Sequence, residues 1–349
     1  MNQNAKLCIL RLSAIGDVCH AVALVNRIQT TRPDIQLTWV IGKVEYQLVK
    51  HLPNIRFVIF DKKQGKAAFK ALEAALGNEQ FDALFVMQVA FRANLVSRKI
   101  NAKKRYGFDW HRSKELHWLF TNAHVSAHPQ CHVLDGFMDF ADAAGIPPLD
   151  PVTWNFPLPE KDESWVENQL SPHLNTGQKL AVINPAASKK ERNWLSENYA
   201  KIADYLTEKG WLVVLSGGPA EMEITLAEEI EKQASQPLVN FVGKTSLPQL
   251  AALLKRCNLV IAPDTGPAHI AAMMGCQVVG LYAHSNPRRT GPYHNLHNVV
   301  SVYDDVIAQQ KGKPWMQLPW GTRAKGKELM QKITLDAVKD KIDNIVNCD

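Results

Sequence analysis

The stretch KLCILRLSAIGDVCHAVALV, residues 6–25, joins an apolar run to an amphipathic run through a short polar turn. Residues 7–12 are apolar apart from Arg11, as in a buried strand, and residues 18–31 have the apolar spacing of a helix. A strand that leads directly into a helix is the first half of a β-α-β unit, which brings parallel strands together. We therefore expect an α/β protein whose first strand and helix lie in this stretch.

The same alternation continues on both sides of a proline-rich segment. Residues 147–159 hold five prolines, which disfavour helix and remove backbone donors, so this segment is expected to be an extended linker. Before it, strands are expected at residues 7–12, 37–41, 57–60 and 83–87, and helices at 18–31, 45–51 and 66–76. After it, strands are expected at residues 179–183, 212–215, 239–242, 259–261 and 278–281, and helices at 197–209, 220–233, 247–256 and 268–274. The pattern predicts two doubly wound units facing a cleft, with ligands outside the carboxyl ends of the strands.

Length and composition agree with two ordinary globular domains. A chain of 349 residues exceeds the usual size of one hydrophobic core, and 46% hydrophobic with 21% charged residues excludes long disorder. The 40 basic residues exceed the 34 acidic ones by six, which favours an anionic partner. We find no signal-peptide core and no apolar run of about 18 residues that could span a membrane.

The cysteines are spaced in neither CxxC pairs nor a zinc-finger pattern, so we expect reduced thiols and a cytosolic protein. They are Cys8, Cys19, Cys131, Cys257, Cys276 and Cys348.

Asp17 lies in the turn where the first strand meets the first helix. A dinucleotide fold would place GxGxxG there, but only Gly16 is present, which disfavours an NAD site. One interpretation makes Asp17 the N-cap of the helix, a position that Ser13 could take instead. The other makes it a general base, because a carboxylate at a strand end is ionised near neutral pH and can accept a proton. The two roles do not exclude each other.

The segment APDTGPAHIAA, residues 262–272, again leads from a strand into a helix. Thr265 can cap the helix, Gly266 allows a ligand to approach the backbone, and Pro267 suits the first turn. Free N–H groups and the helix dipole favour a phosphate here, to which His269 could donate. The alternative is a capped helix with a buried histidine.

Two more turns follow predicted strands of the second half. INPAASKKERNW, residues 183–194, is either a solvated basic loop or a set of donors for a diphosphate. Those donors are Ser188, Lys189, Lys190 and Arg192. In LSGGPAEMEI, residues 215–224, Glu221 could accept hydrogen bonds from both ribose hydroxyls, or simply begin a helix whose dipole favours an acid.

A basic belt, residues 92–117, carries eight basic side chains against Asp109 and Glu115. The basic members are Arg92, Arg98, Lys99, Lys103, Lys104, Arg105, Arg112 and Lys114. Aromatic residues are interleaved with them, among them Trp110 and Trp118. This mixture suits an anionic lipid surface, a phosphorylated acceptor or single-stranded nucleic acid, and a plain solvated face is the alternative.

The three histidines that follow the belt, His124, His128 and His132, are spaced by four residues, as on one face of a helix. A metal site is conceivable from this spacing. Because Pro129 interrupts the stretch and no acidic ligand recurs in register, we predict no metal.

Over essentially its full length the chain resembles the ADP-heptose–lipopolysaccharide heptosyltransferases, glycosyltransferase family 9. The resemblance is most specific in RLSAIGDVCHA at 11–21, SGGPAEME at 216–223 and KTSLPQLAALLKRCNLVIAPDTGPAHIAA at 244–272. Segments 132–141, 280–293 and 318–330 are similar to heptosyltransferase I of the type that acts on a single phosphorylated Kdo on lipid A.

The resemblance implies the GT-B fold, with two Rossmann-like doubly wound domains. Residues 1–160 would bind the acceptor and residues 175–324 the nucleotide sugar, with a terminal helix at about 325–349 packing back on the first domain. The implied reaction is an inverting transfer of heptose from ADP-L-glycero-D-manno-heptose to Kdo of lipid A. It needs no cofactor and occurs at the inner face of the inner membrane. Family members that act on another core sugar, like heptosyltransferase II, and non-catalytic nucleotide- or nucleic-acid-binding proteins are the alternatives.

The resemblance also implies roles for individual residues, with Asp17 as the catalytic base. The residues implied to bind the donor are Ser188, Arg192, Glu221, Asp264, Thr265, Gly266 and His269. The residues expected to bind the acceptor's carboxylate and phosphates are Arg11, Lys62, Lys63, Lys66, Arg92, Arg98, Arg105 and Arg112. The turn at 186–188 departs from relatives that place adjacent hydroxyl residues there, which leaves Ser188 open. No DxD pair suited to Mg²⁺ is expected at the cleft, and Asp304 and Asp305 are assigned to a later loop.

Overall fold

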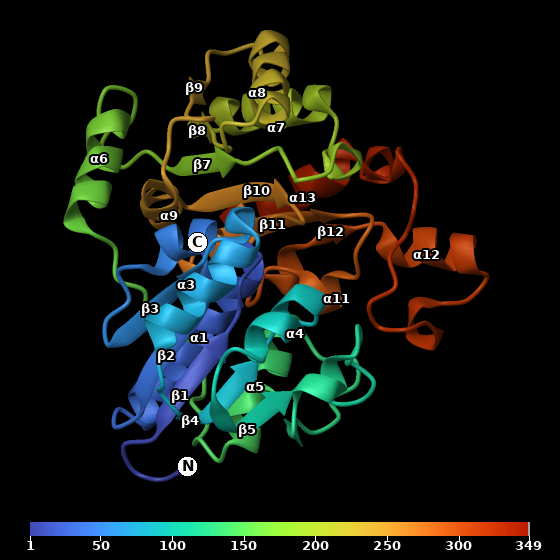
Figure 1. Ribbon diagram of the computed structural model, residues 1–349. Coiled ribbons are helices and arrows are strands. Elements are labelled where there is room, and N and C mark those ends of the chain that lie inside the picture. Colours follow the sequence, from blue (N-terminus) through green and yellow to red (C-terminus); the bar gives the residue numbers. More distant parts are fainter. Residues whose placement is uncertain (348–349) are drawn as a thin grey trace. The chain divides into compact units, whose positions relative to one another are not determined.

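The computed structural model describes residues 1–347, which form two compact units divided between Pro157 and Leu158, inside the predicted linker (Figure 1). Each unit contains one parallel sheet of six strands. Of the six cysteines, five are described and all five are free thiols, whereas Cys348 lies outside the described residues. The predicted α/β class with two doubly wound units is confirmed.

The first sheet has the strand order β3-β2-β1-β4-β5-β6, with all strands parallel. Its strands are β1 (Lys6–Leu10), β2 (Gln36–Gly42), β3 (Ile55–Phe60), β4 (Phe81–Val86), β5 (Ala102–Gly107) and β6 (Ala123–His124). The direction of progression reverses between β1 and β4. In sheets of this order the loops that follow those two central strands diverge, which leaves a crevice at their carboxyl ends.

Helices cover both faces of the first sheet, so its strands are buried on both sides. Cys8 and Leu10 of β1 point into a cluster with α3 and α4, while Phe85 of β4 stacks on Phe140 of α5, with ring centroids 5.6 Å apart. The helix α5 contacts α1 on that same face. The helices are α1 (Ile15–Thr31), α2 (Lys43–Val49), α3 (Lys66–Leu76), α4 (Phe91–Ser97) and α5 (Val133–Ala143), with the 3₁₀ turns η1 (Lys62–Gln64) and η2 (His117–Phe120).

The second sheet repeats this design, in the order β12-β11-β10-β7-β8-β9. Its strands are β7 (Leu180–Ile183), β8 (Leu212–Leu215), β9 (Val239–Asn240), β10 (Leu259–Pro263), β11 (Gln277–Tyr282) and β12 (Val300–Ser301). Its helices are α6 (Glu160–Leu170), α7 (Ser196–Glu208), α8 (Glu221–Gln233), α9 (Leu247–Arg256), α10 (Gly266–Met273), α11 (Pro287–Thr290), α12 (Tyr303–Lys311) and α13 (Leu335–Val346). The 3₁₀ turns are η3 (Lys190–Arg192), η4 (Leu296–Asn298), η5 (Trp315–Gln317) and η6 (Leu329–Lys332). The reversal falls between β7 and β10.

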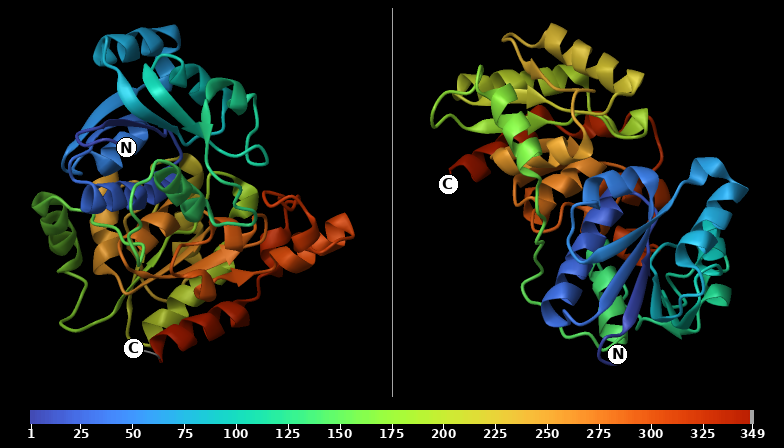
Figure 2. Two further views of the ribbon diagram at one scale, coloured as in Figure 1. Left: turned by 90° about the horizontal axis from the view of Figure 1, so that it is seen from below. Right: turned by 60° about the vertical axis from the view of Figure 1, so that its left-hand side comes forward.

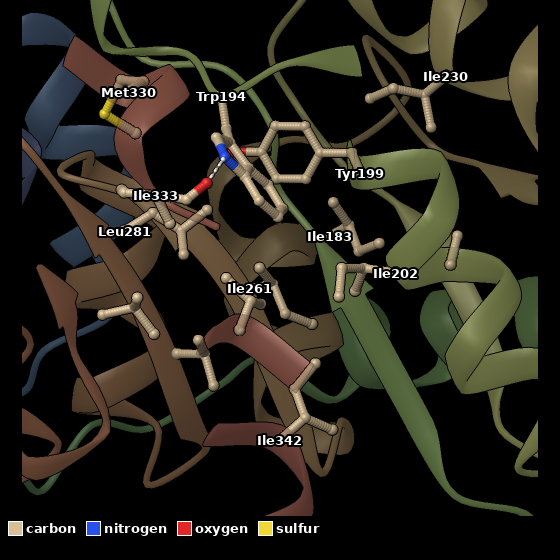
Figure 3. Packing of buried hydrophobic residues seen from close by; sticks show 14 of the residues in the cluster. Ile183, Trp194, Tyr199, Ile202, Ile230, Ile261, Leu281, Met330, Ile333 and Ile342 are labelled. Atoms are coloured by element: carbon tan, nitrogen blue, oxygen red, sulfur yellow. Dashed lines mark hydrogen bonds between the residues drawn. The ribbon is translucent and has the colours of Figure 1, made fainter. Parts of the chain in front are cut away.

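The terminal helix α13 packs within the second unit, and the expectation that it also packs back on the first domain stays a prediction. It contacts α7 and β11, and its buried Ile342 belongs to the same core as Ile202 and Ile261 (Figures 2 and 3). The preceding segment is held by Trp194, whose indole Nε1 donates to the carbonyl of Ile333 at 3.0 Å (Figure 3). The helix also begins at Leu335 rather than near residue 325, because residues 313–334 form 3₁₀ turns and loops.

The second unit also begins earlier than residue 175, the expected start. The helix α6 lies directly after the division and contacts α9. Two ion pairs join these helices, Lys255–Glu163 and Arg256–Glu167, each with a nitrogen–oxygen distance of 2.9 Å. Polar, acidic α6 has a weak helical pattern, which is why the apolar periodicity did not reveal it.

We expect Ile342→Ala to lower the stability of the second unit by about 2–5 kcal/mol, since a fully buried isoleucine leaves both lost contacts and a cavity. Denaturant titration followed by intrinsic fluorescence measures this loss. Asn344→Ala is the control on the same helix, because its side chain is exposed, and it should change stability by less than about 0.5 kcal/mol. Equal stabilities for the two variants would contradict the placement of α13 in this core.

Candidate active site

Asp17 lies at the carboxyl edge of the first sheet and is the third residue of α1. The N-cap position belongs to Ala14, so neither Asp17 nor Ser13 is the N-cap residue. The Asp17 carboxylate accepts a long hydrogen bond from the Ala14 N–H at 3.4 Å and is paired with the Arg11 guanidinium. With 31% of its side chain exposed, the carboxylate is held by the protein and is also open to a ligand.

Arg11 links the segments that follow the two central strands. Its guanidinium donates to the carbonyl of Met87, just after β4, and lies over the Phe137 ring at 5.3 Å from the centroid. The Gln88 side chain accepts from the backbone N–H of Leu12 at 2.9 Å, which closes the same junction. Asp17 is therefore positioned at the reversal between β1 and β4. Arg11, expected to bind the acceptor, is here the partner of Asp17.

A second carboxylate, that of Glu45 on α2, was not found from the sequence. Burial raises the pKa of Glu45, and the positive charges of Lys62 and Arg11 oppose that rise. A Cβ added to Gly42 would lie 2.4 Å from Glu45 Oε2, so the glycine makes room for this side chain. No local motif distinguishes Glu45 from any other acid in the first turn of a helix.

The predicted acceptor lysines near this edge are exposed. Lys62 and Lys63 lie on η1, and Lys66 begins α3. The turn is fixed by Asp61, whose carboxylate accepts from the Lys63 N–H at 3.0 Å. That hydrogen bond and the nearby Lys43 ammonium hold the pKa of Asp61 below its usual range. The three lysines remain a group of cations available to an anionic ligand.

The basic belt is not one continuous cationic surface, because half of its side chains have partners within the first unit. Arg105 donates to the carbonyls of Ser97, Ile100 and Phe120, and Arg112 is paired with Asp109 and Asp139. Lys99 pairs with Glu73 at 2.8 Å, and Lys103 pairs with Asp82 at 2.7 Å. Of the acceptor residues predicted in the belt, Arg92 and Arg98 are therefore the exposed cations, whereas Arg105 and Arg112 brace the fold.

The three histidines spaced by four do not share a helix face. His124 ends β6, His128 lies in a loop, and His132 is the N-cap residue of α5. His128 instead meets Cys131 and Asp139, with ligand atoms within 4.8 Å of one another. The Arg112 guanidinium already contacts this cluster, at 2.9 Å from Asp139 Oδ2 and 3.5 Å from Cys131 Sγ.

In the second unit Arg192 and Asp264 meet at the carboxyl edge of the sheet. Asp264 follows β10, and Arg192 ends the turn η3, with 4.0 Å between Arg192 Nη1 and Asp264 Oδ2. The Ser285 hydroxyl, after the neighbouring strand β11, donates to the same carboxylate oxygen. Burial raises the pKa of Tyr282, and the Asp264 carboxylate raises it further. Ser285 and Tyr282 were not found from the sequence, because only the pairing of β10 with β11 brings them to Asp264.

The N-terminus of α10 lies directly beside Asp264. Thr265 occupies the N-cap position without a side-chain capping hydrogen bond, so its hydroxyl does not compete for the first N–H groups of the helix. Gly266 and Pro267 begin the first turn of the helix, and His269, its fourth residue, is buried. This arrangement has the donors and the dipole that favour a bound anion.

Two polar residues that the sequence analysis did not single out follow β7 and β8. Asn184 and Ser216 are buried, and Asn184 Nδ2 donates to the Ser216 carbonyl at 2.8 Å. Asn184 Oδ1 and Ser216 Oγ have no hydrogen-bond partner among residues 1–347. Burying such groups unpaired is costly, so a ligand or water is expected to satisfy them. A polar residue directly after an apolar strand is the sequence signal that could have found them.

The remaining predicted donor residues are exposed at this edge. Ser188 lies in the loop before η3, and Glu221 begins α8. The turn before α8 is fixed by Glu223, whose carboxylate accepts from the Gly218 N–H at 2.6 Å. Because Glu223 serves the turn, the Glu221 carboxylate is the one available to hydroxyl groups of a ligand.

The acidic pair at 304–305 lies in the first turn of α12 rather than in a loop. Arg288 binds the Asp304 carboxylate through two hydrogen bonds of 2.9 and 2.8 Å. The Arg288–Asp304 ion pair therefore joins α11 to α12. In the range 1–347 the structure has no helix whose length and apolarity would let it cross a bilayer.

Comparison with known proteins identifies the family. Residues 69–316 match the model of glycosyltransferase family 9 (heptosyltransferase). The chain is 43% identical over 332 residues to the lipopolysaccharide core heptosyltransferase OpsX of Haemophilus influenzae, covering 95% of this chain and 94% of that protein. Lipopolysaccharide heptosyltransferase 1 of Escherichia coli K12 is 23% identical, over 82% of this chain and 91% of that protein.

The fold is shared with solved structures of the same kind. A family 9 glycosyltransferase from Veillonella parvula superposes with a TM-score of 0.84 at 20% identity, covering 100% of this chain and 99% of that one. The E. coli heptosyltransferase WaaC, solved with ADP, superposes with a TM-score of 0.74 at 21% identity, covering 97% and 99%. These structures bear out the predicted GT-B fold. The chain therefore belongs to glycosyltransferase family 9, the heptosyltransferases.

Proposed function

We propose that this enzyme transfers heptose from ADP-L-glycero-D-manno-heptose to a Kdo residue of lipid A, in the synthesis of the lipopolysaccharide inner core. The observation that carries the proposal is the group formed by Arg192, Asp264 and the N-terminus of α10 at the reversal of the second sheet. It suits the diphosphate of a nucleotide sugar. The similarity to OpsX, a lipopolysaccharide core heptosyltransferase, supports the choice of sugar and acceptor.

In this proposal the second unit binds the donor. Arg192 and the N–H groups of Gly266, Ala268 and His269 stabilise the negative charge that grows on ADP as the glycosidic bond breaks. Glu221 accepts hydrogen bonds from the ribose hydroxyls, and Thr265 and His269 complete the phosphate contacts. The Asn184 and Ser216 oxygens are additional polar groups at this edge. Ser188, exposed before η3, is a peripheral donor contact.

The first unit would supply the base and the acceptor site. Asp17 takes the proton of the acceptor hydroxyl. At the same time the hydroxyl oxygen bonds to the anomeric carbon and ADP leaves, in one displacement with inversion. Arg11 orients the Asp17 carboxylate. Lys62, Lys63 and Lys66 would bind the carboxylate and phosphate of a phosphorylated Kdo.

The enzyme is proposed to work at the inner face of the inner membrane, where the acceptor's lipid would be embedded. Transfer to another core sugar, as by a heptosyltransferase II, is the second candidate, since the curated relatives include lipopolysaccharide heptosyltransferase 2 of E. coli K12 at 24% identity. A third outcome, binding of a nucleotide or nucleic acid without catalysis, would give no ADP release.

A product assay tests the proposal. Purified enzyme is given ADP-heptose and one of three acceptors: lipid A with one phosphorylated Kdo, with two Kdo, or with a heptosylated core. We expect heptose on the phosphorylated Kdo, with stoichiometric ADP, and the same yield in excess EDTA because Arg192 and α10 supply the positive charge. Product on the heptosylated core alone would favour the second candidate, and no ADP release from any acceptor would reject the proposed reaction.

Asp17→Asn should slow turnover about 10²–10⁴-fold, because the amide cannot accept the acceptor's proton. The ADP affinity should stay close to that of the wild type, since the nucleotide is bound by the second unit. Initial rates and ADP titration calorimetry measure the two effects separately. Asp34→Asn is the matched control, because it also removes a carboxylate paired with an arginine of the first unit, Arg32. Wild-type turnover in Asp17→Asn would leave Asp17 a structural role only.

Ser285→Ala should raise the Kd for ADP about tenfold or more, because a hydrogen bond to a charged group contributes about 1.5 kcal/mol or more. Without the hydroxyl, Asp264 is free to turn toward Arg192 and to compete with the diphosphate for its guanidinium. Ser285→Thr keeps the hydroxyl and should retain most of the affinity. Ser301→Ala, which removes an exposed hydroxyl of the same unit, is the control. Equal ADP affinity in Ser285→Ala and wild type would exclude this positioning role.

A further inference from the structure

Large apolar side chains are exposed on α4, on η2 and in the segment before η2, at the surface of the first unit. Six large hydrophobic side chains there are between 39% and 69% exposed. These residues, which we call the apolar patch, are Phe91, Leu95, Trp110, Leu116, Trp118 and Leu119. The elements α4 (Figure 1) and η2 contact each other. The ring centroids of Trp110 and Trp118 lie 5.7 Å apart. The six residues therefore form a group and are not scattered single exposures.

The inner faces of the same two elements combine two apolar core residues of α4 with a buried polar network. Asn94, Ser97 and His117 are fully buried. His117 Nδ1 is 2.8 Å from Asn94 Oδ1, and Asn94 Nδ2 donates to the carbonyl of Glu115 at 2.9 Å. Burial lowers the pKa of His117 to about 4, so the ring is neutral near pH 7. Its Nδ1–H then donates to Asn94.

An ordinary surface helix buries its apolar stripe and presents polar residues to water. In α4 the exposed positions carry Phe91 and Leu95 as well as Arg92. Its buried positions include polar residues beside its two apolar core residues. In η2, His117 is buried while Trp118 and Leu119 are exposed. A contiguous apolar surface of this kind marks an interaction site.

Cations without acidic partners surround the patch. Arg92, Arg98 and Lys114 are exposed and form no ion pair with any residue in the range 1–347. Arg92 is adjacent to Phe91, Arg98 follows Leu95 by three residues on α4, and Lys114 precedes Leu116 by two. Of the two acids next to patch residues in the sequence, Glu115 uses its carboxylate to accept from the Phe91 N–H, and Asp109 pairs with Arg112. The patch thus has an apolar centre and a basic rim.

We propose that the apolar patch inserts shallowly into a bilayer that contains anionic phospholipids, with Arg92, Arg98 and Lys114 at the headgroups. The inference deepens the proposed function, on which it rests for the lipid nature of the acceptor, by naming the surface that meets the membrane. Tryptophan side chains and basic residues together suit the boundary between headgroups and acyl chains. The basic rim selects an anionic bilayer, because a cationic edge has no complement on a neutral one.

The first experiment is flotation of the full chain with phosphatidylglycerol-rich vesicles and with pure phosphatidylcholine vesicles, over a series of salt concentrations. We expect binding to the anionic vesicles that weakens as salt screens the rim, with a remainder at high salt because apolar contacts are not screened. The double variant Trp118→Ser, Leu119→Ser should lose that remainder and bind about tenfold or more weakly at low salt, given the area it removes.

Matched variants in the second unit are the controls. Ile224→Ser with Met316→Ser removes two exposed apolar side chains there and should leave flotation unchanged. The rim is tested by neutralising its three cations to Gln, which should weaken low-salt binding between about tenfold and a hundredfold. The charge-matched control neutralises three exposed lysines of the second unit in the same way: Lys161, Lys232 and Lys313.

Insertion itself is measured by quenching of tryptophan fluorescence with lipids brominated on the acyl chain. The fluorescence of the wild type should be quenched more than that of Trp118→Phe. The difference in quenching between the two proteins is the contribution of Trp118. Equal quenching of the two proteins would show that this residue does not enter the acyl region. Equal flotation of wild type and the double variant, or no flotation of wild type at low salt, would overturn the proposal.

Two further results separate this inference from the proposed reaction. If wild type fails to float but transfers heptose to a deacylated Kdo acceptor, the reaction is retained and the membrane surface is rejected. If wild type floats through the patch but transfers no heptose, the surface is retained and the reaction is rejected. Light scattering that shows a wild-type dimer and a monomeric double variant, without vesicle binding, would assign the patch to self-association and overturn the membrane proposal.

Discussion

Both units depend on one constraint of parallel sheets: neighbouring strands cannot be joined by tight turns, so each connection must cross back over a face of the sheet. All the carboxyl ends then lie along one edge, and the two loops that follow the central strands diverge where the strand order reverses. In the first unit that reversal, between β1 and β4, holds Asp17 and Arg11. In the second unit, between β7 and β10, it holds Asp264 and Asn184. The polar residues that we assign to chemistry are thus gathered by backbone topology.

Each of these edges restrains a carboxylate with an arginine, and the two pairs differ in how closely the charges meet. The Arg11 guanidinium is in close contact with Asp17 and also binds a backbone carbonyl, so it fixes the direction of the carboxylate. Arg192 lies 4.0 Å from Asp264, whose carboxylate is also held by Ser285. The looser pair leaves the Arg192 guanidinium able to meet an anion. A tight pair suits a base that must be oriented, whereas a loose pair suits a cation that must bind a ligand.

The first unit also shows how charge counted along the sequence differs from charge offered to a partner. The basic belt has an excess of six charges in the sequence, yet Arg105 and Arg112 are used to hold loops and Lys99 and Lys103 pair with acids from elsewhere in the unit. What remains on the surface is a small set of cations around an apolar patch. On the inner side of these elements Asn94 and His117 pair with each other, while several large apolar side chains are exposed.

The sequence by itself determined the fold class, the linker, most strands and helices, and the turns that hold Asp17, Arg192, Glu221 and Asp264, because these depend on local periodicity and on polar residues directly after apolar strands. It missed α6, whose apolar pattern is weak, and it also missed the elements α4, α5, α11, α12, β5, β6 and β12. It did not show that α13 joins the core of the second unit, because the apolar face of a helix does not by itself specify the core it will join. Only the tertiary structure decided that Ser285 holds Asp264, that Glu45 lies near Arg11, and that α4 exposes two of its large apolar side chains. Those outcomes depend on which strands pair and which side chains meet across them, and contacts between residues far apart in the chain leave no periodic trace in the sequence.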